Sequence, residues 1–359
     1  MIFVSEEESA RLITHEAAFP AVRAALIAAA SDDGRVFPSV HGRASDPANT
    51  FSVKSGSTRD LTGLKVGSFW SRNPDMGLPR HNSTIILLDQ QIGRPRAVIE
   101  GGRVNAYRTA AADAVAADLL ARPDAETLTI FGAGNQARHE VFALARIRNI
   151  VRVHVVARPS SRADALVHEI RETGLDAGLA TAEEACRAAD IIVTATPARA
   201  PLFEAEWVRP GTHVASMGSD APGKQELPPE LFSGARLFCD LPSQSVVIGE
   251  FQHVRQRIEA GDLVLDPLGA ALDGRIEGRT SPEEITVFDS SGISIQDLYI
   301  GQMIVDSLRR GAAASRASPI DRSARGLGPD RRPDHETGLA SGPGGPDPTF
   351  RFTPSAAQR

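Results

Sequence analysis

The order of hydrophobic and polar residues predicts one long helix and a sheet in the first part of the chain. The segment THEAAFPAVRAALIAAAS is Ala-rich and amphipathic, so it predicts a helix with Thr14 as its N-cap. Pro20 predicts a kink or a break near the start of this helix. Four short β-rich runs follow, separated by Gly, Pro and Asn, which is typical of a mostly antiparallel sheet: TFSVKSG, TGLKVGSFW, STIILLD and RPRAVIEG.

Strands and helices alternate regularly after Pro123. Before this proline, RTAAADAVAADLLAR predicts a helix with Arg108 in its first turn. Continuous apolar runs come after it: TLTIF, VRVHVV, DIIVTATP, GTHVASMG and RLFCDLP. Runs without polar alternation are typical of strands buried on both faces, so they predict a doubly wound parallel sheet. A last strand, EITVFDS, leads into a helix that is expected to end near Arg310.

These patterns predict an α/β fold with two domains. The chain has 359 residues, of which 42% are hydrophobic, and this length suits two moderate cores. We expect the doubly wound domain over residues 121–294, and an α+β domain from residues 1–120 and 295–311. Residues 312–359 are rich in Pro, Gly, Ser and Arg and poor in aliphatic residues, so we expect a disordered tail.

Charge and cysteine content narrow the function classes. The formal net charge is −6, and no basic stripe is present that would neutralise nucleic-acid phosphates. Cys186 and Cys239 have no metal-like spacing and favour a reducing compartment, so we expect a cytoplasmic protein without a metal site. The acidic N-terminus lacks signal-peptide features, and no apolar run reaches the roughly 20 residues that cross a bilayer.

A glycine-rich turn predicts a dinucleotide site. In TLTIFGAGNQARHE, the residues Gly132, Gly134 and Ala137 form a GxGxxA pattern between an apolar strand and a helix. The first glycine permits a tight turn, the second lets the backbone approach a pyrophosphate, and the small third residue lets helix and strand pack closely. A tight turn without a nucleotide is the alternative, which the following strand–helix units disfavour.

The end of the second parallel strand favours NADPH over NADH. In NAD-binding proteins this strand ends in an acid that binds the ribose hydroxyls. Here it continues as VVARPSSR, in which Arg158 and Arg162, with the hydroxyl of Ser161 nearby, suit a 2′-phosphate. The alternative is that both arginines only solvate a surface loop.

Two basic residues are candidates for binding a carboxylate. In the first helical turn, the charge of Arg108 would oppose the macrodipole, and this arrangement becomes favourable if helix N-terminus and guanidinium bind an anion together. Lys65 is flanked by apolar residues in TGLKVGSFW and is the second candidate. Either side chain could instead be an ordinary solvated base.

The stretch SMGSDAPGKQEL places a lone acid, Asp220, just past the carboxyl end of a predicted parallel strand. Open α/β sheets bind their ligands at this end. A carboxylate there, close to a nicotinamide, can hold a substrate nitrogen and pass it a proton. Because Asp before Pro-Gly is also common in turns, the residue pattern alone leaves both interpretations open.

Four motifs together resemble the ornithine cyclodeaminase/μ-crystallin family over residues 5–310. They are GLKVGSFWSRNPDMGLP, NAYRTAAADAVAADLLARPDAETLTIFGAGNQA, GSDAPGKQEL and VFDSSGISIQDL. The resemblance implies a Rossmann domain, a substrate and dimerisation domain built from both chain ends, and a homodimer. It also implies three catalytic residues, with Lys65 and Arg108 on the substrate carboxylate and Asp220 on the nitrogen.

The resemblance also guides the choice of further candidate residues. Ornithine cyclodeaminases hold the distal ammonium with an acid in the strand where this chain has FSVKSG, so Lys54 favours a second carboxylate instead. His41, Arg43 and Lys224 are the other substrate-binding candidates, and His41 and Arg43 stay alternatives for one arginine of the family. The remaining cofactor candidates are Ser83, Thr84, Asn135, Gln136, Thr196, Met217, Gly218, Ser291 and Gly292.

The chemistry of this family is diverse, so membership leaves the reaction open. GLPRHNSTIILLD, QSVVIGEFQH and FDSSGISIQDL are most similar to the iminosuccinate-reductase-like branch. The leading hypothesis is an NAD(P)H-dependent reductase of a small imino acid, with iminosuccinate first and Δ1-pyrroline-2-carboxylate or Δ1-piperideine-2-carboxylate second. The alternatives are an ornithine cyclodeaminase, which forms proline and ammonia without net redox change, and a non-catalytic NADPH-binding protein.

Overall fold

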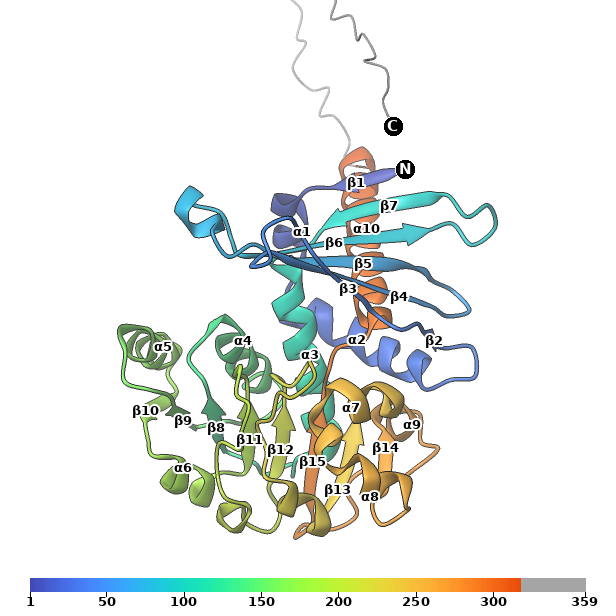
Figure 1. The fold of residues 1–359 in the computed structure, drawn as a ribbon. Helices are drawn as coiled ribbons and strands as arrows, with labels where there is room; N and C mark the ends of the chain where they lie inside the picture. The colour runs from blue at the N-terminus through green and yellow to red at the C-terminus, as the bar shows by residue number, and fades with distance from the viewer. Residues whose placement is uncertain (318–359) are drawn as a thin grey trace, which may run out of the picture. The chain divides into compact units, whose positions relative to one another are not determined.

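The computed structural model describes residues 1–317. The tail was predicted for residues 312–359, but residues 312–317 continue the last helix, Ser294–Ala317, and the rest of the predicted tail lies outside the described residues. The described chain contains an antiparallel-type sheet and a parallel sheet, with helices packed on both (Figure 1). The predicted α/β class with a doubly wound parallel sheet is therefore confirmed. Residues 1–315 form one compact unit by their contacts, so the predicted domain boundaries stay a prediction.

The first sheet has seven strands, which lie in the order β1-β7-β6-β5-β4-β2, with β3 paired to β4. All its pairs are antiparallel except β1 with β7. Its strands are β1 (Ile2–Val4), β2 (Arg35–Val36), β3 (Val40–Arg43), β4 (Thr50–Ser57), β5 (Thr62–Phe69), β6 (His81–Leu88) and β7 (Pro95–Glu100). A short 3-10 helix, η1 (Asn73–Met76), lies between β5 and β6.

The second sheet has eight parallel strands in the order β10-β9-β8-β11-β12-β15-β13-β14. They are β8 (Thr127–Phe131), β9 (Arg152–Val156), β10 (Asp176–Leu179), β11 (Ile191–Thr194), β12 (His213–Ser216), β13 (Ala235–Cys239), β14 (Leu265–Pro267) and β15 (Ile285–Asp289). The chain runs outward from β8 to β10 and then returns to β11 on the other side of β8. This reversal makes β8 and β11 the switch point, where open sheets form a ligand crevice.

The helices around the parallel sheet are α3 (Val104–Leu120), α4 (Asn135–Leu144), α5 (Ser161–Glu172), α6 (Ala182–Ala188), α7 (Pro242–Ile248), α8 (Arg255–Glu259) and α9 (Leu268–Leu272). Three short 3-10 helices join its later strands: η2 (Ala205–Trp207), η3 (Pro229–Gly234) and η4 (Glu250–Val254). The small elements between β12 and β15 lack a clear sequence period, because each is only three to seven residues long.

At the N-terminus, α1 (Glu6–Leu12) precedes α2 (His15–Ala29). The hydroxyl of Thr14 accepts a hydrogen bond from the Ala17 amide at 3.1 Å, as the N-cap prediction requires. Pro20 was expected to cause a kink or a break, and the break is wrong, since α2 is continuous through it. One face of α2, including Val22 and Leu26, is buried in the core, and this packing compensates the one hydrogen bond that proline cannot make.

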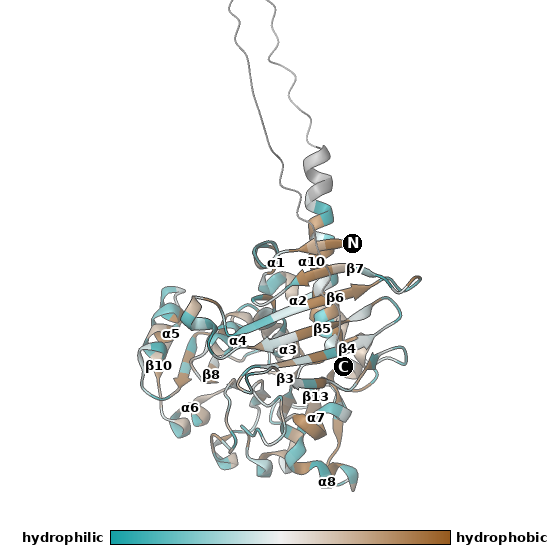
Figure 2. Cartoon of the chain, turned by 45° about the horizontal axis from the view of Figure 1, so that its top comes forward, coloured by the Kyte–Doolittle hydropathy of each residue, from teal (hydrophilic) through white to brown (hydrophobic). Residues whose placement is uncertain are grey.

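The last helix, α10 (Ser294–Ala317), packs on the first sheet and extends past the expected end near Arg310. Gly301 permits this close packing, since a Cβ there would lie 3.1 Å from the side chain of Ile85 on β6. A helix from the C-terminal part of the described chain therefore packs against a sheet formed by its N-terminal part. Figure 2 shows apolar segments on the strands of this sheet that face the viewer.

None of the single helices in residues 1–317 is long and apolar enough to cross a membrane. Taken together, α1 and α2 meet the length and composition test, but they are bent by 91° relative to each other.

Candidate functional site

A cavity of about 480 Å³ opens between the first sheet, the start of α3 and the loop after β12. Register places Ser52, Lys54, Lys65, Gly67 and Ser83 on one face of strands β4 to β6, because directly paired residues point to the same side. Of these, Lys54, Lys65 and Ser83 were predicted site residues, and the predicted residues His41, Arg43, Arg108 and Asp220 also line the cavity. The fold thus gathers predicted residues from positions 41 to 220 around one space.

Lys54 and Lys65 are directly opposite each other in the β4–β5 pairing. Two like charges in such a pair destabilise a sheet unless a partner compensates them. Arg108 adds a third cation to the same cavity. This concentration of positive charge predicts that the cavity binds an anion.

One acid from α10 joins this cluster. Asp297 accepts a hydrogen bond from the Lys65 ammonium at 3.0 Å and lies 3.4 Å from Nε of Arg108. Asn105 accepts from both cations, at 2.9 Å from Lys65 and at 3.1 Å from Arg108. Asp297 and Asn105 therefore fix the two cations side by side while leaving excess positive charge toward the cavity.

Burial changes the protonation of both lysines. Loss of water lowers the pKa of Lys65 to about 8, although Asp297 raises it, and Arg108 and Lys54 lower it further. The pKa of Lys54 is also lowered, first by burial and then by Arg108. A bound carboxylate would stabilise both ammonium groups, so ligand binding and protonation support each other here.

Arg108 does not lie in the first turn of its helix, and the prediction that it shares an anion with the helix N-terminus is wrong. Helix α3 begins at Val104, which places Arg108 in the second turn. The carboxylate of Glu6 accepts the amides of Gly102 at 2.7 Å and of Arg103 at 2.8 Å, so this acid from α1 already occupies the N-terminus. The sequence pattern missed this cap because about a hundred residues separate its partners.

The loop after β15 packs against Lys54 and Arg108 of the substrate cavity. Gly292 has a φ of +73°, and a Cβ there would lie 2.8 Å from Nη1 of Arg108, so only glycine fits. Lys54 donates to the carbonyls of Ser291 at 3.3 Å and Gly292 at 2.9 Å, and Asp240 accepts the Gly292 amide at 2.7 Å. Lys54 thus holds this loop in addition to lining the cavity.

Asp220 is the one acid that lines this cavity within the described chain, and it comes from the loop after β12. Its side chain is 55% exposed and forms an ion pair with Lys224, whose ammonium also donates to the Gly218 carbonyl at 3.1 Å. Lys224 does not line the cavity. The structure therefore places Lys224 beside Asp220 and away from the substrate space.

A second cavity, of about 1130 Å³, lies at the carboxyl ends of β8, β9 and β11. Gly132 and Gly134 line it, and Gly132 has a φ of +114° with the carbonyl of Ala195 2.9 Å from its Cβ position. No atom lies within 4 Å of the Cβ position of Gly134, so its backbone faces open space. Ala137 is fully buried where α4 packs beside β8. This geometry suits a pyrophosphate at the N-terminus of α4.

Basic residues line the far part of the same cavity. Arg158 and Arg162 are exposed and contribute to its wall, as does Thr196. Ser160 also lines it and caps α5 by accepting the Ala163 amide, whereas the predicted Ser161 begins the helix outside the wall. No acid is among the lining residues of this cavity, which are all within the described chain.

Other cofactor candidates lie at different distances from this cavity. Asn135 is exposed at the start of α4, and Gln136 donates to the Glu140 carboxyl at 2.6 Å. Met217 is buried, and Gly218 donates its amide to Glu226 at 2.8 Å. Thr84 lies on the opposite face of β6 from Ser83, away from the substrate cavity, because neighbouring residues of a strand alternate.

Several residues of the site were missed by sequence reasoning. Asp297 and Asn105 lie inside the motifs VFDSSGISIQDL and NAYRTAA, yet no local pattern shows that they meet Lys65. His81 lines the substrate cavity beside Phe69, with ring centroids 4.9 Å apart. Burial is the main cause that lowers the pKa of His81, and the nearby charge of Asp220 raises it.

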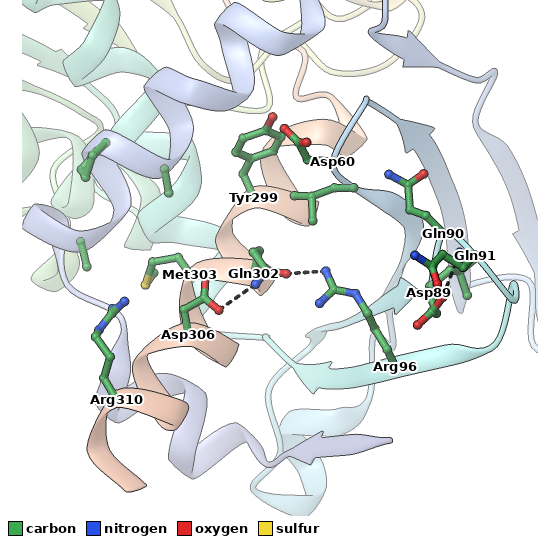
Figure 3. A pocket seen from close by; sticks show the side chains of 15 residues that line it. Asp60, Asp89, Gln90, Gln91, Arg96, Tyr299, Gln302, Met303, Asp306 and Arg310 are labelled. Carbon is green, nitrogen blue, oxygen red and sulfur yellow. Dashed lines mark hydrogen bonds between the residues drawn. The ribbon is translucent and has the colours of Figure 1, made fainter. Parts of the chain in front are cut away.

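A third cavity, of about 830 Å³, lies beside α10 and contains none of the predicted residues. Figure 3 shows Arg96 bonded to Gln302, which in turn donates to Asp306 at 2.8 Å. This chain of bonds links the charges of Arg96 and Asp306, and the cavity is also lined by Asp60, Asp89 and Arg310. It lacks the excess positive charge of the cavity around Lys65.

The two cavities together provide the parts of a hydride-transfer site. The glycine turn can hold a dinucleotide, the cations can orient a carboxylate, and Asp220 can exchange a proton with a substrate nitrogen. A nicotinamide cofactor would supply the hydride when bound. The protein's own groups would orient the substrate and manage the proton.

Comparison with known proteins matches this architecture. The chain is 36% identical over 311 residues to the iminosuccinate reductase of Paracoccus denitrificans, covering 85% of this chain and 96% of that protein. The crystal structure of that enzyme in complex with NAD+ superposes with a TM-score of 0.81 at 35% identity, over 87% of this chain and 97% of that chain.

The names of two further relatives indicate different substrates. The alanine dehydrogenase of Archaeoglobus fulgidus is 32% identical, covering 85% of this chain and 94% of that protein. The structure of Thermococcus litoralis Δ1-pyrroline-2-carboxylate reductase in complex with NADH and L-proline has a TM-score of 0.78 at 27% identity, over 87% of this chain and 98% of that chain. The family model matches residues 4–312, and the chain belongs to the ornithine cyclodeaminase/mu-crystallin family.

Proposed function

We propose that this protein is an NAD(P)H-dependent oxidoreductase that reduces the C=N bond of a small imino acid to give an L-amino acid. The observation that carries the proposal is the cluster of Lys54, Lys65 and Arg108 in one cavity that Asp220 also lines. Lys65 and Arg108 would bind the α-carboxylate, Lys54 would help to bind a second carboxylate, and Asp220 would hydrogen-bond the imine nitrogen. Relatives with 32–36% identity include an iminosuccinate reductase and an alanine dehydrogenase, which supports this reaction class.

Iminosuccinate is the first candidate substrate because the cavity has room for a second anion. Arg43 lines the mouth and makes no ion pair within the described chain, and His41 and His81 lie on the same wall. A second carboxylate would meet these groups. The distal ammonium of ornithine would instead need an acid, and Asp220 is already assigned to the reacting nitrogen.

The cofactor proposal is NADPH in preference to NADH. Arg158 and Arg162 line the nucleotide cavity at the end of β9, where no acid contributes to the wall formed by described residues. A guanidinium there suits a 2′-phosphate. Several relatives are named with NAD or NADH, so the two cofactors need direct comparison in this protein.

We further propose a homodimer. The archaeal alanine dehydrogenase structure is described as a dimer. The face of the first sheet opposite the substrate cavity carries Leu64, Ile86 and Val98 only partly buried, and Phe3 is 60% exposed. A second copy of the chain would cover this apolar surface.

One screen tests the reaction. Purified protein is mixed with NADPH or NADH and with oxaloacetate plus ammonia, pyruvate plus ammonia or methylamine, or either cyclic imino acid. Nicotinamide absorbance should fall fastest with oxaloacetate and ammonia. Faster oxidation with Δ1-pyrroline-2-carboxylate or Δ1-piperideine-2-carboxylate would identify the second candidate.

Two other outcomes would contradict the proposal. Formation of proline and ammonia from ornithine without net cofactor consumption would identify a cyclodeaminase. Tight NADPH binding without oxidation across the whole panel would favour a non-catalytic binding protein.

A further inference from the structure

Glu226 is a fully buried acid at the carboxyl ends of the central strands of the parallel sheet. Its Oε1 accepts hydrogen bonds from the amide of Thr196 at 2.7 Å and from the Thr196 hydroxyl at 2.8 Å. Its Oε2 accepts from the Thr194 hydroxyl at 2.9 Å, the Ser216 hydroxyl at 3.1 Å and the Gly218 amide at 2.8 Å. One carboxylate therefore joins the ends of two neighbouring strands, β11 and β12.

Two of these donors, Thr196 and Gly218, lie in loops beside the nucleotide cavity and the substrate cavity. Thr196 lines the nucleotide cavity, and Gly218 lies two residues before Asp220, which lines the substrate cavity. The segments are close, since a Cβ on Gly218 would lie 2.2 Å from the Thr196 carbonyl and 2.7 Å from Oε1 of Glu226. Any shift of Glu226 would therefore move both Thr196 in the nucleotide cavity and the loop that carries Asp220.

A separate set of contacts holds Glu226 itself. Glu250 on η4 accepts the backbone amides of Glu226 at 3.1 Å and of Leu227 at 2.8 Å. The Ser216 hydroxyl also lies 3.2 Å from Glu250, and its single proton can be donated to only one of the two acids at a time. No ion pair of Glu226 with Lys, Arg or His occurs among residues 1–311. Neutral donors alone satisfy the Glu226 carboxylate, which is buried too deeply to contact solvent.

We propose that Glu226 is a positioning residue that sets the distance between the bound nicotinamide and Asp220. It touches neither ligand and acts through the amides of Thr196 and Gly218. This inference rests on the proposed function for its effect on turnover. Its effect on cofactor binding does not depend on which substrate the protein uses.

The test is the Glu226→Gln variant, which keeps the side-chain size. Each carboxylate oxygen accepts one backbone amide, which can only donate: the Thr196 amide on one oxygen and the Gly218 amide on the other. Whichever oxygen glutamine replaces by NH2, the new N–H groups would face one of these donors and must push one loop away. We expect the Kd for NADPH to rise about 10-fold or more, because the bonds that break involve a charged acceptor. The kcat should fall by at least a similar factor, while KM for the imine changes less.

Asp190→Asn is the matched control. Asp190 also accepts two backbone amides between neighbouring strands, from Glu126 and Thr127 at 3.0 Å each, but at the opposite end of the same sheet. Both variants should lower the melting temperature. Only Glu226→Gln should change the Kd for NADPH, measured by nucleotide fluorescence titration without substrate.

A folded Glu226→Gln variant with wild-type Kd and kcat would overturn the proposal, and so would equal losses of binding in Asp190→Asn. If Glu226→Gln does not fold, Thr194→Val removes one donor with little change of shape and should raise the Kd for NADPH by a smaller factor in the same direction. An unchanged Kd in Thr194→Val would then contradict it. If wild-type protein binds NADPH but reduces no imine, the proposed function fails while the binding test still applies.

Discussion

At the scale of single residues, Asp220 and Arg158 have separate proposed roles, in proton transfer and in binding the cofactor 2′-phosphate. The Asp220 side chain is 55% exposed, so solvent can return the proton that it would donate during imine reduction. Arg158 lies in the other cavity, on the wall after β9. Because no described residue links the two side chains directly, each can be changed without altering the contacts of the other.

We expect Asp220→Asn to lose most turnover while it retains cofactor binding. The amide keeps the shape of the side chain but cannot donate the proton of a carboxylic acid, and removal of a general acid costs about 10²–10⁴-fold in rate. Nicotinamide absorbance reports turnover, and fluorescence titration reports the Kd for the cofactor. Unchanged turnover would exclude Asp220 from proton transfer.

We expect Arg158→Ala to weaken NADPH binding far more than NADH binding. A hydrogen bond to a charged group contributes about 1.5–3 kcal/mol, which corresponds to roughly 10- to 150-fold in Kd. Arg152→Ala is the control, because Arg152 begins the same strand and pairs with Asp176 at the other end. Equal losses for NADPH and NADH in Arg158→Ala would contradict the role for the 2′-phosphate.

At the scale of elements, α3 and α4 are packed together across two buried acids. Asp113 on α3 and Glu140 on α4 are both fully buried, and among residues 1–311 the one hydrogen bond that Glu140 accepts on its side chain comes from Gln136 at 2.6 Å. Burial raises the pKa of Asp113 to about 7 and also raises that of Glu140, where the neighbouring Asp113 adds to the effect. The pair therefore favours a protonated carboxyl between the helix of Arg108 and the helix that begins at the glycine turn.

This pair should make stability fall as pH rises. Because the folded state raises the pKa of Asp113 above its ordinary value of 3.8, its contribution is complete below about pH 4 and is lost as pH passes about 7. Asp113→Asn replaces the ionisable group by a neutral donor that can bond Glu140. At pH 8 we expect the free energy of unfolding to rise by about 1–3 kcal/mol, in the range of an unsatisfied buried polar group.

Urea denaturation of wild type and Asp113→Asn at pH 5 and pH 8 checks this prediction. The difference in stability between the two proteins should be larger at pH 8 than at pH 5. Asp118→Asn is the control on the same helix, since Asp118 is 53% exposed and pairs with Arg148. The same difference at both pH values would show that the buried pair does not titrate in this range.

At the scale of the whole molecule, the first sheet has two faces of different character. One face holds Lys54, Lys65 and Ser83 around the substrate cavity and receives α10. The other face carries partly buried apolar residues and is the surface proposed for dimerisation. A dimer would therefore leave the substrate cavity of each copy on the inner side of its own sheet.

A charge on the outer face should separate the two copies. Ile86 lies in the central strand β6 and is only partly buried, so Ile86→Lys would place an ammonium in a proposed apolar interface. Light scattering after size-exclusion chromatography should give the dimer mass for wild type and the monomer mass for this variant. Val264→Lys is the control, since Val264 is 71% exposed and precedes β14. A monomeric wild-type protein would contradict the dimer itself.

Most of the fold followed from local patterns in the sequence. Continuous apolar runs after Pro123 predicted the parallel sheet, and the structure has strands at TLTIF, VRVHVV and EITVFDS. Thr14 was correctly expected to cap α2. The start of α3 was placed too late, because the cap that defines it is Glu6 on another helix.

The candidate site was predictable in its residue types but not in its contacts. Lys65 and Arg108 could be selected as unusual bases in apolar or helical segments, and the structure brings both to one cavity. Asp297 and Asn105 had no comparable signal, since an acid or amide in a helical turn is common. Asp297 is separated from Lys65 by 232 positions along the chain, so its role depends on the fold that brings the two side chains together.

The sequence by itself determined the strand–helix alternation, the glycine turn and the family, because periodicity and turn chemistry depend on neighbouring residues. Only the tertiary structure decided that Lys54 is opposite Lys65, that Asp297 joins Lys65 to Arg108 and that Glu226 connects Thr196 with Gly218. The physical reason is that strand register and the packing of distant helices bring these groups together. Charge compensation and hydrogen bonding act over a few ångströms in space, whatever the distance along the chain.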